Sequence, residues 1–419
     1  MDKIIIHGPS YLKGEVSISG AKNAALPILV SSLLSSGTYE ISNVPHLKDI
    51  ETILSLLSHL GATVKRNKEE VKISSDAISC FEAPYEQVKT MRASILVLGP
   101  LLARFKKAKV SLPGGCAIGE RPINLHLAAL EKLGADIQLE NGYVIAKTAG
   151  LKGARIYFDT PTVTGTENMM MAATLAQGVT VLENSAREPE ITDLANALNQ
   201  MGAFISGAGT DTITIEGVRE LKATSYRVMQ DRIETGTFLI AVAATGGEVE
   251  IKNCNSIHLE ALIEKLTAAG VKISCQKDSI LVKSDRIIQN LHVQTQPYPG
   301  FPTDLQAQLM VLLSQAQGAS VITENIFENR FNHVAELRRM GANITIDGRT
   351  AVIEGFTPLS GAPVMATDLR ASASLVIAGL IARGKTEISR VYHLDRGYEQ
   401  LDQKLKTLGA NIERVRGVS

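Results

Sequence analysis

The chain has 419 residues, of which 45% are hydrophobic and 21% are charged, and its 43 basic side chains balance its 43 acidic ones. A chain without net charge has no global field that would favour nucleic acid or an anionic membrane. The length predicts two or more domains.

Neither a membrane span nor export is indicated. The most apolar stretches, 24–34, 94–105 and 371–382, are shorter than the roughly 20 residues that cross a bilayer. The first ten residues have too short an apolar core for a signal peptide. Four cysteines, at positions 80, 116, 254 and 275, show no CxxC or zinc-type spacing. A reducing cytoplasm is the compartment that this pattern favours.

One short pattern recurs through the chain, as LGATV, LGADI, MGAFI, AGVKI, MGANI and LGANI. Its glycines fall at 61, 134, 202, 270, 341 and 409, so successive spacings are 73, 68, 68, 71 and 68 residues. Such regularity indicates one structural unit copied six times. Each glycine follows a helical apolar pattern, such as Ile53, Leu56, Leu57 and Leu60, and is expected to end that helix in the left-handed conformation.

Each copy also contains a helical stretch that is apolar all round, from NAALPILVSSLL in the first to LRASASLVIAG in the last. A helix of this kind is a buried helix. We therefore expect an α/β protein with two similar inside-out domains, each of three units whose buried helices are surrounded by sheets and surface helices. The domains are expected at 21–229 and 230–419, and residues 1–20 are expected to complete the second.

The starts of the buried helices carry unusual polar residues at equivalent positions: Lys22, Arg92, Thr164, Asp231, Asp304 and Arg370. Free N–H groups at helix starts can bind anions, so helices directed into a cleft between the domains would form an anion site. We interpret Thr164, Asp231 and Arg370 as helix caps or ion-pair partners that support such a site. Lys22 is different, because a long cation beside a buried helix is costly without a partner.

The second copy departs most from the repeat, in the stretch SLPGGCAIGERP at 111–122. Its glycines give the backbone the freedom of a lid, and Pro122 suits the first turn of the next helix. Cys116 would then lie in a mobile loop with Arg121 nearby. A reactive thiol is expected in such an exposed position close to a cation. Cys80, Cys254 and Cys275 lie in strand-like segments and are interpreted as structural.

Three further motifs follow in the second half of the chain. In YPGFPTDLQAQ, turns deliver Asp304 to the start of a buried helix. It could be a helix N-cap or a general base held in the cleft, and the sequence does not decide between the two. Arg330 in FENRF and Arg396 in HLDRGYE could equally be solvated arginines.

Taken together, GAKNAALP, MRAS, LPGGCAIGERPINLHL, DRIETGTF, YPGFPTDLQAQ, ENRF, TDLRASASLV and HLDRGYE closely resemble the enolpyruvyl transferase family, over the whole chain. Within it they resemble the enzymes that act on UDP-N-acetylglucosamine. The resemblance implies transfer of the enolpyruvyl group of phosphoenolpyruvate to the sugar 3-hydroxyl with release of phosphate, the first committed step of peptidoglycan synthesis. It also implies no metal or organic cofactor, inhibition by fosfomycin, and domain closure around small-molecule substrates.

Residue roles are carried over from the same resemblance. Cys116 would protonate the methylene carbon or add covalently to C2, and Asp304 would take the proton of the sugar hydroxyl. The phosphoenolpyruvate site would comprise Lys22, Asn23, Arg121, Arg330 and Arg396. The sugar-nucleotide site would comprise Asn23, Arg92, Arg121, Pro122, Ile123, Asn124, Leu125, Thr162, Val163, Thr164, Asp304 and Ile326.

Two positions depart from what the family leads us to expect. A smaller residue is expected at Thr164, and an acidic one is common at Asn124, so contacts to uridine are in doubt there. Three alternatives stay open: an enolpyruvyl transferase for another acceptor such as shikimate 3-phosphate, a non-catalytic paralogue that binds sugar nucleotides, and a purely structural repeat protein. The cysteine loop argues against the first, and the site residues argue against the other two.

Overall fold

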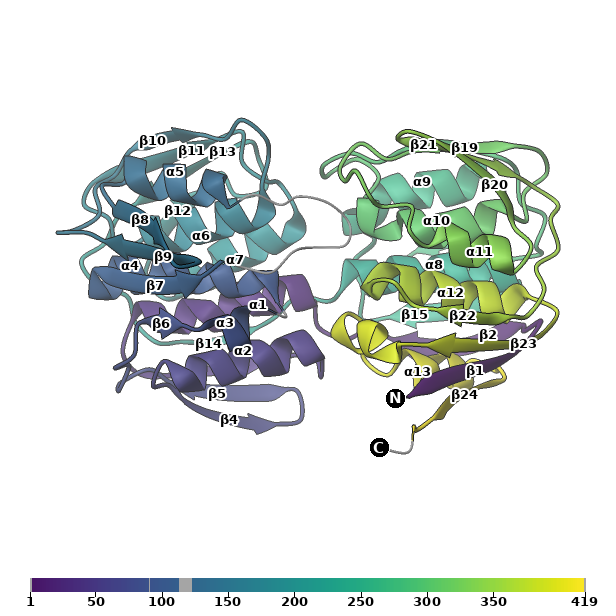
Figure 1. The fold of residues 1–419 in the computed structure, drawn as a ribbon, viewed down its shortest axis with the longest axis horizontal. Coiled ribbons are helices and arrows are strands. Elements are labelled where there is room, and N and C mark those ends of the chain that lie inside the picture. The colour runs from purple at the N-terminus through teal and green to yellow at the C-terminus, as the bar shows by residue number, and fades with distance from the viewer. Residues whose placement is uncertain (1, 90, 113–122, 418–419) are drawn as a thin grey trace. The chain divides into compact units, whose positions relative to one another are not determined.

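The computed structural model describes residues 2–89, 91–112 and 123–417, and these form two compact units (Figure 1). The first unit, called here the N-terminal unit, comprises residues 20–112 and 123–229. The second, the C-terminal unit, comprises residues 2–19 and 230–417. No helix in these described ranges is long and apolar enough to cross a membrane.

Three four-stranded sheets belong to the N-terminal unit. In order across each sheet, the strands are β14 (Ser225–Arg227), β3 (Thr38–Ser42), β5 (Glu70–Ser74) and β4 (Thr63–Asn67); β6 (Glu82–Ala83), β7 (Lys107–Ser111), β9 (Tyr143–Lys147) and β8 (Asp136–Glu140); and β10 (Arg155–Tyr157), β11 (Val179–Glu183), β13 (Thr212–Glu216) and β12 (Phe204–Ser206).

The C-terminal unit has three sheets of the same kind. Their strands, again in order across each sheet, are β2 (Leu12–Ser17), β15 (Gly247–Lys252), β17 (Ser279–Ser284) and β16 (Lys272–Cys275); β18 (His292–Gln294), β19 (Ser320–Thr323), β21 (Thr350–Glu354) and β20 (Asn343–Asp347); and β22 (Pro363–Met365), β23 (Gly384–Ser389), β1 (Lys3–Gly8) and β24 (Ile412–Val415).

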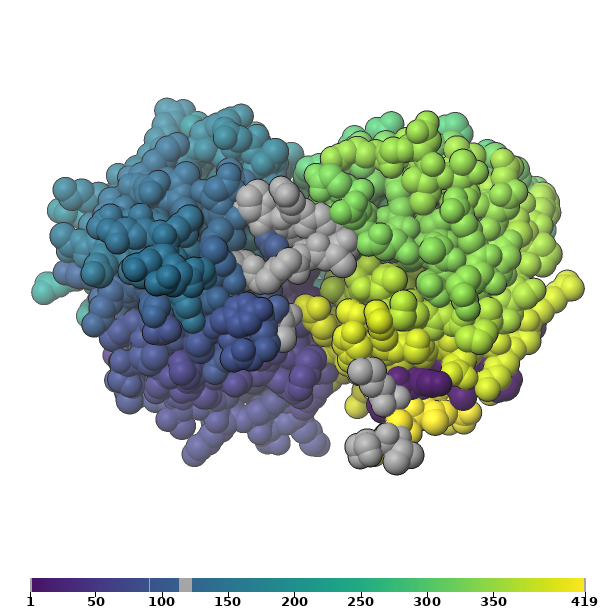
Figure 2. All heavy atoms as spheres, in the orientation of Figure 1, coloured from purple at the N-terminus to yellow at the C-terminus, as the bar shows by residue number. Residues whose placement is uncertain are grey.

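Every sheet repeats one topology, a parallel edge pair followed by two antiparallel pairings. In one sheet, for example, Val16 of β2 lies opposite Ile251 of the parallel β15, and Ile251 lies opposite Ile280 of the antiparallel β17. The N-terminal segment completes two sheets of the C-terminal unit, because β2 pairs with β15 and β1 lies between β23 and β24. Purple N-terminal residues accordingly lie among yellow C-terminal ones in Figure 2.

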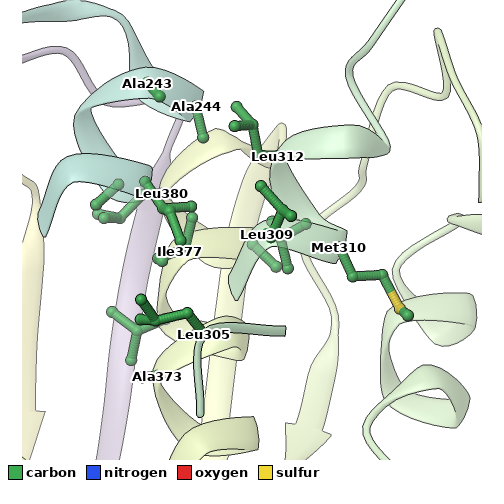
Figure 3. Close-up of a cluster of buried hydrophobic side chains, with 14 of the residues drawn as sticks. Ala243, Ala244, Leu305, Leu309, Met310, Leu312, Ala373, Ile377 and Leu380 are labelled. Carbon is green, nitrogen blue, oxygen red and sulfur yellow. The ribbon is translucent and has the colours of Figure 1, made fainter. Parts of the chain in front are cut away.

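Buried helices fill the centre of each unit. They are α1 (Lys22–Ser31), the 3-10 helix η2 (Arg92–Val97) with α4 (Leu98–Phe105), α6 (Val163–Ala173), α8 (Arg232–Thr245), α10 (Gln306–Leu313) and α12 (Leu369–Ile381). Every residue of α8 and of α10 is buried. In the C-terminal unit Ala244 of α8, Leu309 of α10 and Ile377 of α12 belong to one cluster of apolar side chains (Figure 3). The expected inside-out α/β fold is confirmed.

Each unit also carries surface helices, which end at the six repeated glycines. These helices are α2 (Lys48–His59), α5 (Asn124–Lys132), α7 (Pro189–Gln200), α9 (Glu260–Ala268), α11 (Val334–Arg339) and α13 (Leu401–Thr407). The glycines that follow them have φ between +91° and +109°. A side chain is strained in that region, which explains why one residue type recurs six times.

The N-terminal segment is held to the C-terminal unit by a buried ion pair. Lys404 Nζ lies 2.6 Å from Glu234 Oε1 and donates to Ser19 Oγ at 2.7 Å, while Glu234 Oε2 accepts from the Ser19 N–H at 2.8 Å. Burial raises the pKa of Glu234, although Lys404 opposes that rise. The carboxylate, only 2% exposed, therefore depends on its cation.

We predict that Lys404→Met lowers the free energy of unfolding by about 3 kcal/mol at pH 8, because it leaves a buried carboxylate without its partner. The loss should be smaller at pH 5, where an unpaired Glu234 takes up a proton. Urea unfolding at both pH values measures this. Lys72→Met, which breaks an exposed pair with Glu40, should cost less than about 0.5 kcal/mol. Equal losses in the two variants would contradict the prediction.

Candidate active site

Lys22 is the first residue of α1, and its side chain is 9% exposed. Its Nζ lies 3.3 Å from Oδ2 of Asp49 on α2, whose side chain is 6% exposed. The N-cap residue, Ala21, makes no side-chain capping bond. The partner that a buried lysine requires is thus an aspartate 27 residues further along the chain, which the sequence reasoning did not identify.

His126 of α5 links the starts of several elements in the N-terminal unit. Asn168 of α6 donates from Nδ2 to His126 Nδ1 at 3.1 Å, and its Oδ1 accepts from the Gly99 N–H at 2.8 Å. Since Nδ1 accepts a hydrogen bond, the ring proton belongs on Nε2, which can donate to Thr164 Oγ1 at 3.3 Å. His126 thereby orients Thr164, a predicted sugar-nucleotide residue.

The ring of His126 is neutral at neutral pH. Burial lowers its pKa to about 4, and the positive charge of Arg92 contributes to the shift. Arg92 opens η2, and the Ile95 carbonyl of the same helix accepts from Asn168. The structure therefore places Arg92, the start of α5 and Thr164 around one histidine, which the sequence did not single out.

Two predictions about helix caps have opposite outcomes. Asp231 caps α8, since its carboxylate accepts from the N–H groups of Ile233 at 2.7 Å and Glu234 at 3.0 Å. The prediction that Thr164 caps α6 is wrong, because Thr162 is the N-cap and its hydroxyl accepts from the Gly165 N–H at 3.2 Å. Thr164 is the second residue of α6 and uses its hydroxyl on His126 instead.

In the C-terminal unit, Asp304 lies in the 3-10 helix η4 (Thr303–Leu305), just before α10. Its Oδ1 lies 2.8 Å from Arg330 Nη2, and its Oδ2 lies 3.1 Å from Arg370 Nη2. The side chains of Arg330 and Arg370 are only 4% and 3% exposed. The N-cap interpretation of Asp304 is therefore wrong, since both carboxylate oxygens face arginines.

Arg370 offers more hydrogen-bonding capacity than its described neighbours use. Asp368, not Arg370, caps α12, so the ion-pair interpretation of Arg370 is confirmed. Its Nε and Nη1 are buried without a hydrogen-bond partner among the described residues, and its guanidinium lies 5.3 Å from the centre of the Tyr398 ring. Burial works against the charge, but Asp304 and Tyr398 outweigh it and raise the pKa of Arg370. Buried N–H groups of a permanent cation suit a bound anion.

Arg396 closes the 3-10 helix η5 (Val391–Arg396), which packs against α12. A Cβ on the next residue, Gly397, would meet Leu369 Cδ1 at 2.6 Å and lie 3.6 Å from Arg370 Nη1. Burial and the neighbouring Arg396 charge lower the pKa of His393. Gly397 therefore lets the backbone next to Arg396 approach Arg370, while Asp304, Arg330 and Arg370 are in direct contact.

The remaining predicted residues have these places. Asn23, Ile123, Leu125, Val163 and Ile326 are partly exposed, and Asn124 is exposed at the start of α5. Cys116, Arg121 and Pro122 lie outside the described residues. Where side chains are described, no group of His, Cys, Asp or Glu could hold a metal ion.

Sequence comparison assigns the chain to a family along nearly its whole length. The family described as EPSP synthase (3-phosphoshikimate 1-carboxyvinyltransferase) matches residues 6–405. The chain is 61% identical over 415 residues to UDP-N-acetylglucosamine 1-carboxyvinyltransferase of Geotalea uraniireducens, covering 99% of this chain and 100% of that one. It is 58% identical over 417 residues to the protein of the same name from Thermodesulfovibrio yellowstonii, with the same coverage.

Solved structures agree on the fold. The enolpyruvyl transferase NikO of Streptomyces tendae superposes with a TM-score of 0.90 at 24% identity, covering 99% of this chain and 98% of that one. EPSP synthase of Acinetobacter baumannii superposes with a TM-score of 0.78 at 20% identity, covering 99% and 100%. At these identities the likeness concerns the fold alone.

The neutral histidines of the site predict acid sensitivity. The pKa of His126 is lowered to about 4, as is that of buried His333, where burial is again the main cause. An unfolded histidine titrates near 6.5, so below that pH the unfolded chain binds protons that the folded chain does not. The free energy of unfolding should keep its full value above pH 6.5 and should fall as the pH approaches 4. At pH 5, each of the two histidines should lower it by about 2 kcal/mol.

Urea unfolding of His126→Gln at pH 7 and pH 5 tests this expectation. Between pH 7 and pH 5, the free energy of unfolding of the variant should fall by about 2 kcal/mol less than that of the parent. His7→Gln, at an exposed position of β1, should keep the pH dependence of the parent. An unchanged pH dependence in His126→Gln would rule out the assigned role of His126.

Proposed function

The chain belongs to the EPSP synthase family, and from that membership we propose that it transfers the enolpyruvyl group of phosphoenolpyruvate to the 3-hydroxyl of UDP-N-acetylglucosamine, releasing phosphate. The observation that carries this proposal is the identity of 58–61% over 99% of the chain to relatives named UDP-N-acetylglucosamine 1-carboxyvinyltransferase. Such a reaction is the first committed step of peptidoglycan synthesis.

The arginines of the C-terminal unit suit the donor substrate. Phosphoenolpyruvate carries a phosphate and a carboxylate, and planar guanidinium groups bind both through paired hydrogen bonds. Arg330 and Arg370 both contact Asp304, and Arg370 retains two buried nitrogens that suit a further anion. Lys22, Asn23 and Arg121 complete the proposed set for phosphoenolpyruvate.

Asp304 is proposed as the base that takes the proton of the attacking sugar hydroxyl. Each of its oxygens faces a guanidinium, and these positive charges oppose the uptake of a proton. A substrate carboxylate would compete for the same guanidinium groups, so binding of phosphoenolpyruvate would free Asp304. Asp304 would then act as a base only when phosphoenolpyruvate is bound, so the sugar hydroxyl would not be deprotonated without its reaction partner.

Cys116 is proposed to act at the donor carbons, either as the acid that protonates the methylene carbon or as a nucleophile that adds to C2. The sugar oxygen bonds to C2, the C2–O bond to phosphate breaks, and the methyl group formed returns a proton to restore the double bond. Developing positive charge at C2 needs protection from water. The chain's own role is therefore to exclude solvent and to hold the two proton-transferring groups.

The sugar nucleotide is proposed to contact residues from both halves of the chain. They are Asn23, Arg92, Arg121, Pro122, Ile123, Asn124, Leu125, Thr162, Val163, Thr164, Asp304 and Ile326. His126 supports this set by orienting Thr164. We also propose a cytoplasmic location, since the free thiols of Cys80, Cys254 and Cys275 suit a reducing compartment.

Phosphate release from phosphoenolpyruvate tests the function directly. It should require UDP-N-acetylglucosamine, should not occur with shikimate 3-phosphate, and should stop after treatment with the thiol-reactive epoxide fosfomycin. Release with shikimate 3-phosphate but not with UDP-N-acetylglucosamine would show that shikimate 3-phosphate is the acceptor. Binding of the sugar nucleotide without any release would identify a non-catalytic binding protein.

Asp304→Asn should lower kcat by about 10²- to 10⁴-fold, the usual contribution of a general base. The KM for phosphoenolpyruvate should stay level or fall, because the amide no longer competes as an anion for Arg330 and Arg370. Steady-state kinetics with each substrate varied in turn separate the two effects. A raised KM for phosphoenolpyruvate with unchanged kcat would contradict both roles of Asp304.

Cys116→Ser should lose most of its turnover at neutral pH, since a serine hydroxyl is a much weaker acid than a thiol and a poorer nucleophile. The same phosphate assay measures this loss. The variant should also become insensitive to fosfomycin in a mass-spectrometric test for the adduct. Full activity of the variant at neutral pH would show that Cys116 takes no part in the reaction.

A further inference from the structure

Glu324 is a buried acidic residue directly after β19, and the reaction described above gives it no part. It is 1% exposed. A buried carboxylate is costly unless hydrogen bonds satisfy it, so the groups that donate to Glu324 indicate what it holds in place.

The two oxygens of Glu324 serve two different segments. Oε2 accepts from the hydroxyl of Thr303 at 2.9 Å, and Thr303 is the residue immediately before Asp304. Oε1 accepts from the backbone N–H of Ile326 at 2.9 Å and that of Phe327 at 3.2 Å. One carboxylate thus joins the short η4 helix of the proposed base to the loop that carries Ile326.

Thr295 anchors the same carboxylate to the sheet. Its hydroxyl donates to Glu324 Oε1 at 2.9 Å and accepts from the Asn325 N–H at 2.8 Å. Thr295 follows β18, the edge strand parallel to β19. Thr295 therefore fixes the carboxylate of Glu324 to the sheet, and the three other hydrogen bonds of Glu324 fix the two segments relative to it.

The loop that Glu324 holds returns to Asp304. Residues 325–330 contain neither helix nor strand, so no backbone ladder fixes them. The loop ends at Arg330, whose Nη2 lies 2.8 Å from Asp304 Oδ1. Asp304 is thereby held from two sides, through Thr303 on its own segment and through Arg330 on the loop.

We propose that Glu324 is a positioning residue for the transfer reaction. It fixes Asp304 and Ile326 relative to each other, through Thr303 and the 325–330 loop. This inference rests on the proposed function. A purely structural carboxylate would stabilise the fold without affecting the chemical step, whereas Glu324 controls the geometry of the base. Misplacement of a catalytic group by about 1 Å can cost about 100-fold in rate.

Thr303→Val is the sharpest test, because valine has the shape of threonine and removes only the hydroxyl that binds Glu324 Oε2. The expected result is a 10- to 100-fold lower kcat, with the KM for phosphoenolpyruvate within twofold of the parent. Thr303→Ser, which keeps the hydroxyl, should restore at least half of the parental kcat.

Thr386→Val is the matched control for stability. Thr386 is fully buried on β23 of the same unit, and its hydroxyl has no hydrogen-bond partner among the described residues. Its replacement should leave kcat unchanged. Thermal unfolding of both valine variants separates a change of fold from a change of the chemical step, since Thr303→Val should keep a parental melting temperature within a few degrees.

Glu324→Gln supplies a second measurement. The amide oxygen can keep the bonds of Oε1, whereas the amide nitrogen no longer accepts from the Thr303 hydroxyl and can only donate to it. The kcat should therefore fall, but no further than in Thr303→Val, and the double variant should be no slower than the worse single one. An active parent together with a Thr303→Val variant whose kcat is within twofold of it would overturn the positioning role. An inactive parent would instead overturn the proposed function.

Discussion

A helix that is buried on every side can carry polar groups only where hydrogen bonds or ion pairs satisfy them, and this constraint organises the whole molecule. α8 and α10 have no exposed residue, so neither can present a functional side chain along its length. Lys22, Asp304 and Arg370 all lie within the first two residues of a buried helix or in the short turn before one. These three functional side chains therefore lie at helix starts.

Charges at those starts need partners, because they lie next to apolar cores. Asp49 pairs with Lys22 across two helices, and Asp304 pairs with two buried arginines. Where no substrate is bound, the protein supplies the counter-charges itself. Substrate anions can then replace a protein carboxylate at an arginine, which costs less than placing a new charge in an unprepared site.

Much of the fold could be predicted because its signals are local and repeated. The glycine at the end of each surface helix adopts the expected positive φ in all six copies, and the apolar stretches form the buried helices. The site was predicted less completely, because its partners come from distant elements. Asp304 and Arg370 are 66 residues apart, and no local pattern connects His126 to Thr164 or Glu324 to Thr303. Sequence alone also misassigned the cap of α6, since Thr162 and Thr164 are equally suitable residue types.

The helix starts of the six copies are capped in different ways. Thr162, Asp231 and Asp368 cap α6, α8 and α12 with their side chains. Ala21, Met91 and Pro302 precede α1, η2 and η4 and make no such bond. The three starts without a side-chain cap are those that carry Lys22, Arg92 and Asp304. Starts with a side-chain cap also carry site residues, Thr164 on α6 and Arg370 on α12, so the cap and the functional side chain are separate features of a helix start. Divergence within one repeated fold can therefore give equivalent structural positions several different roles.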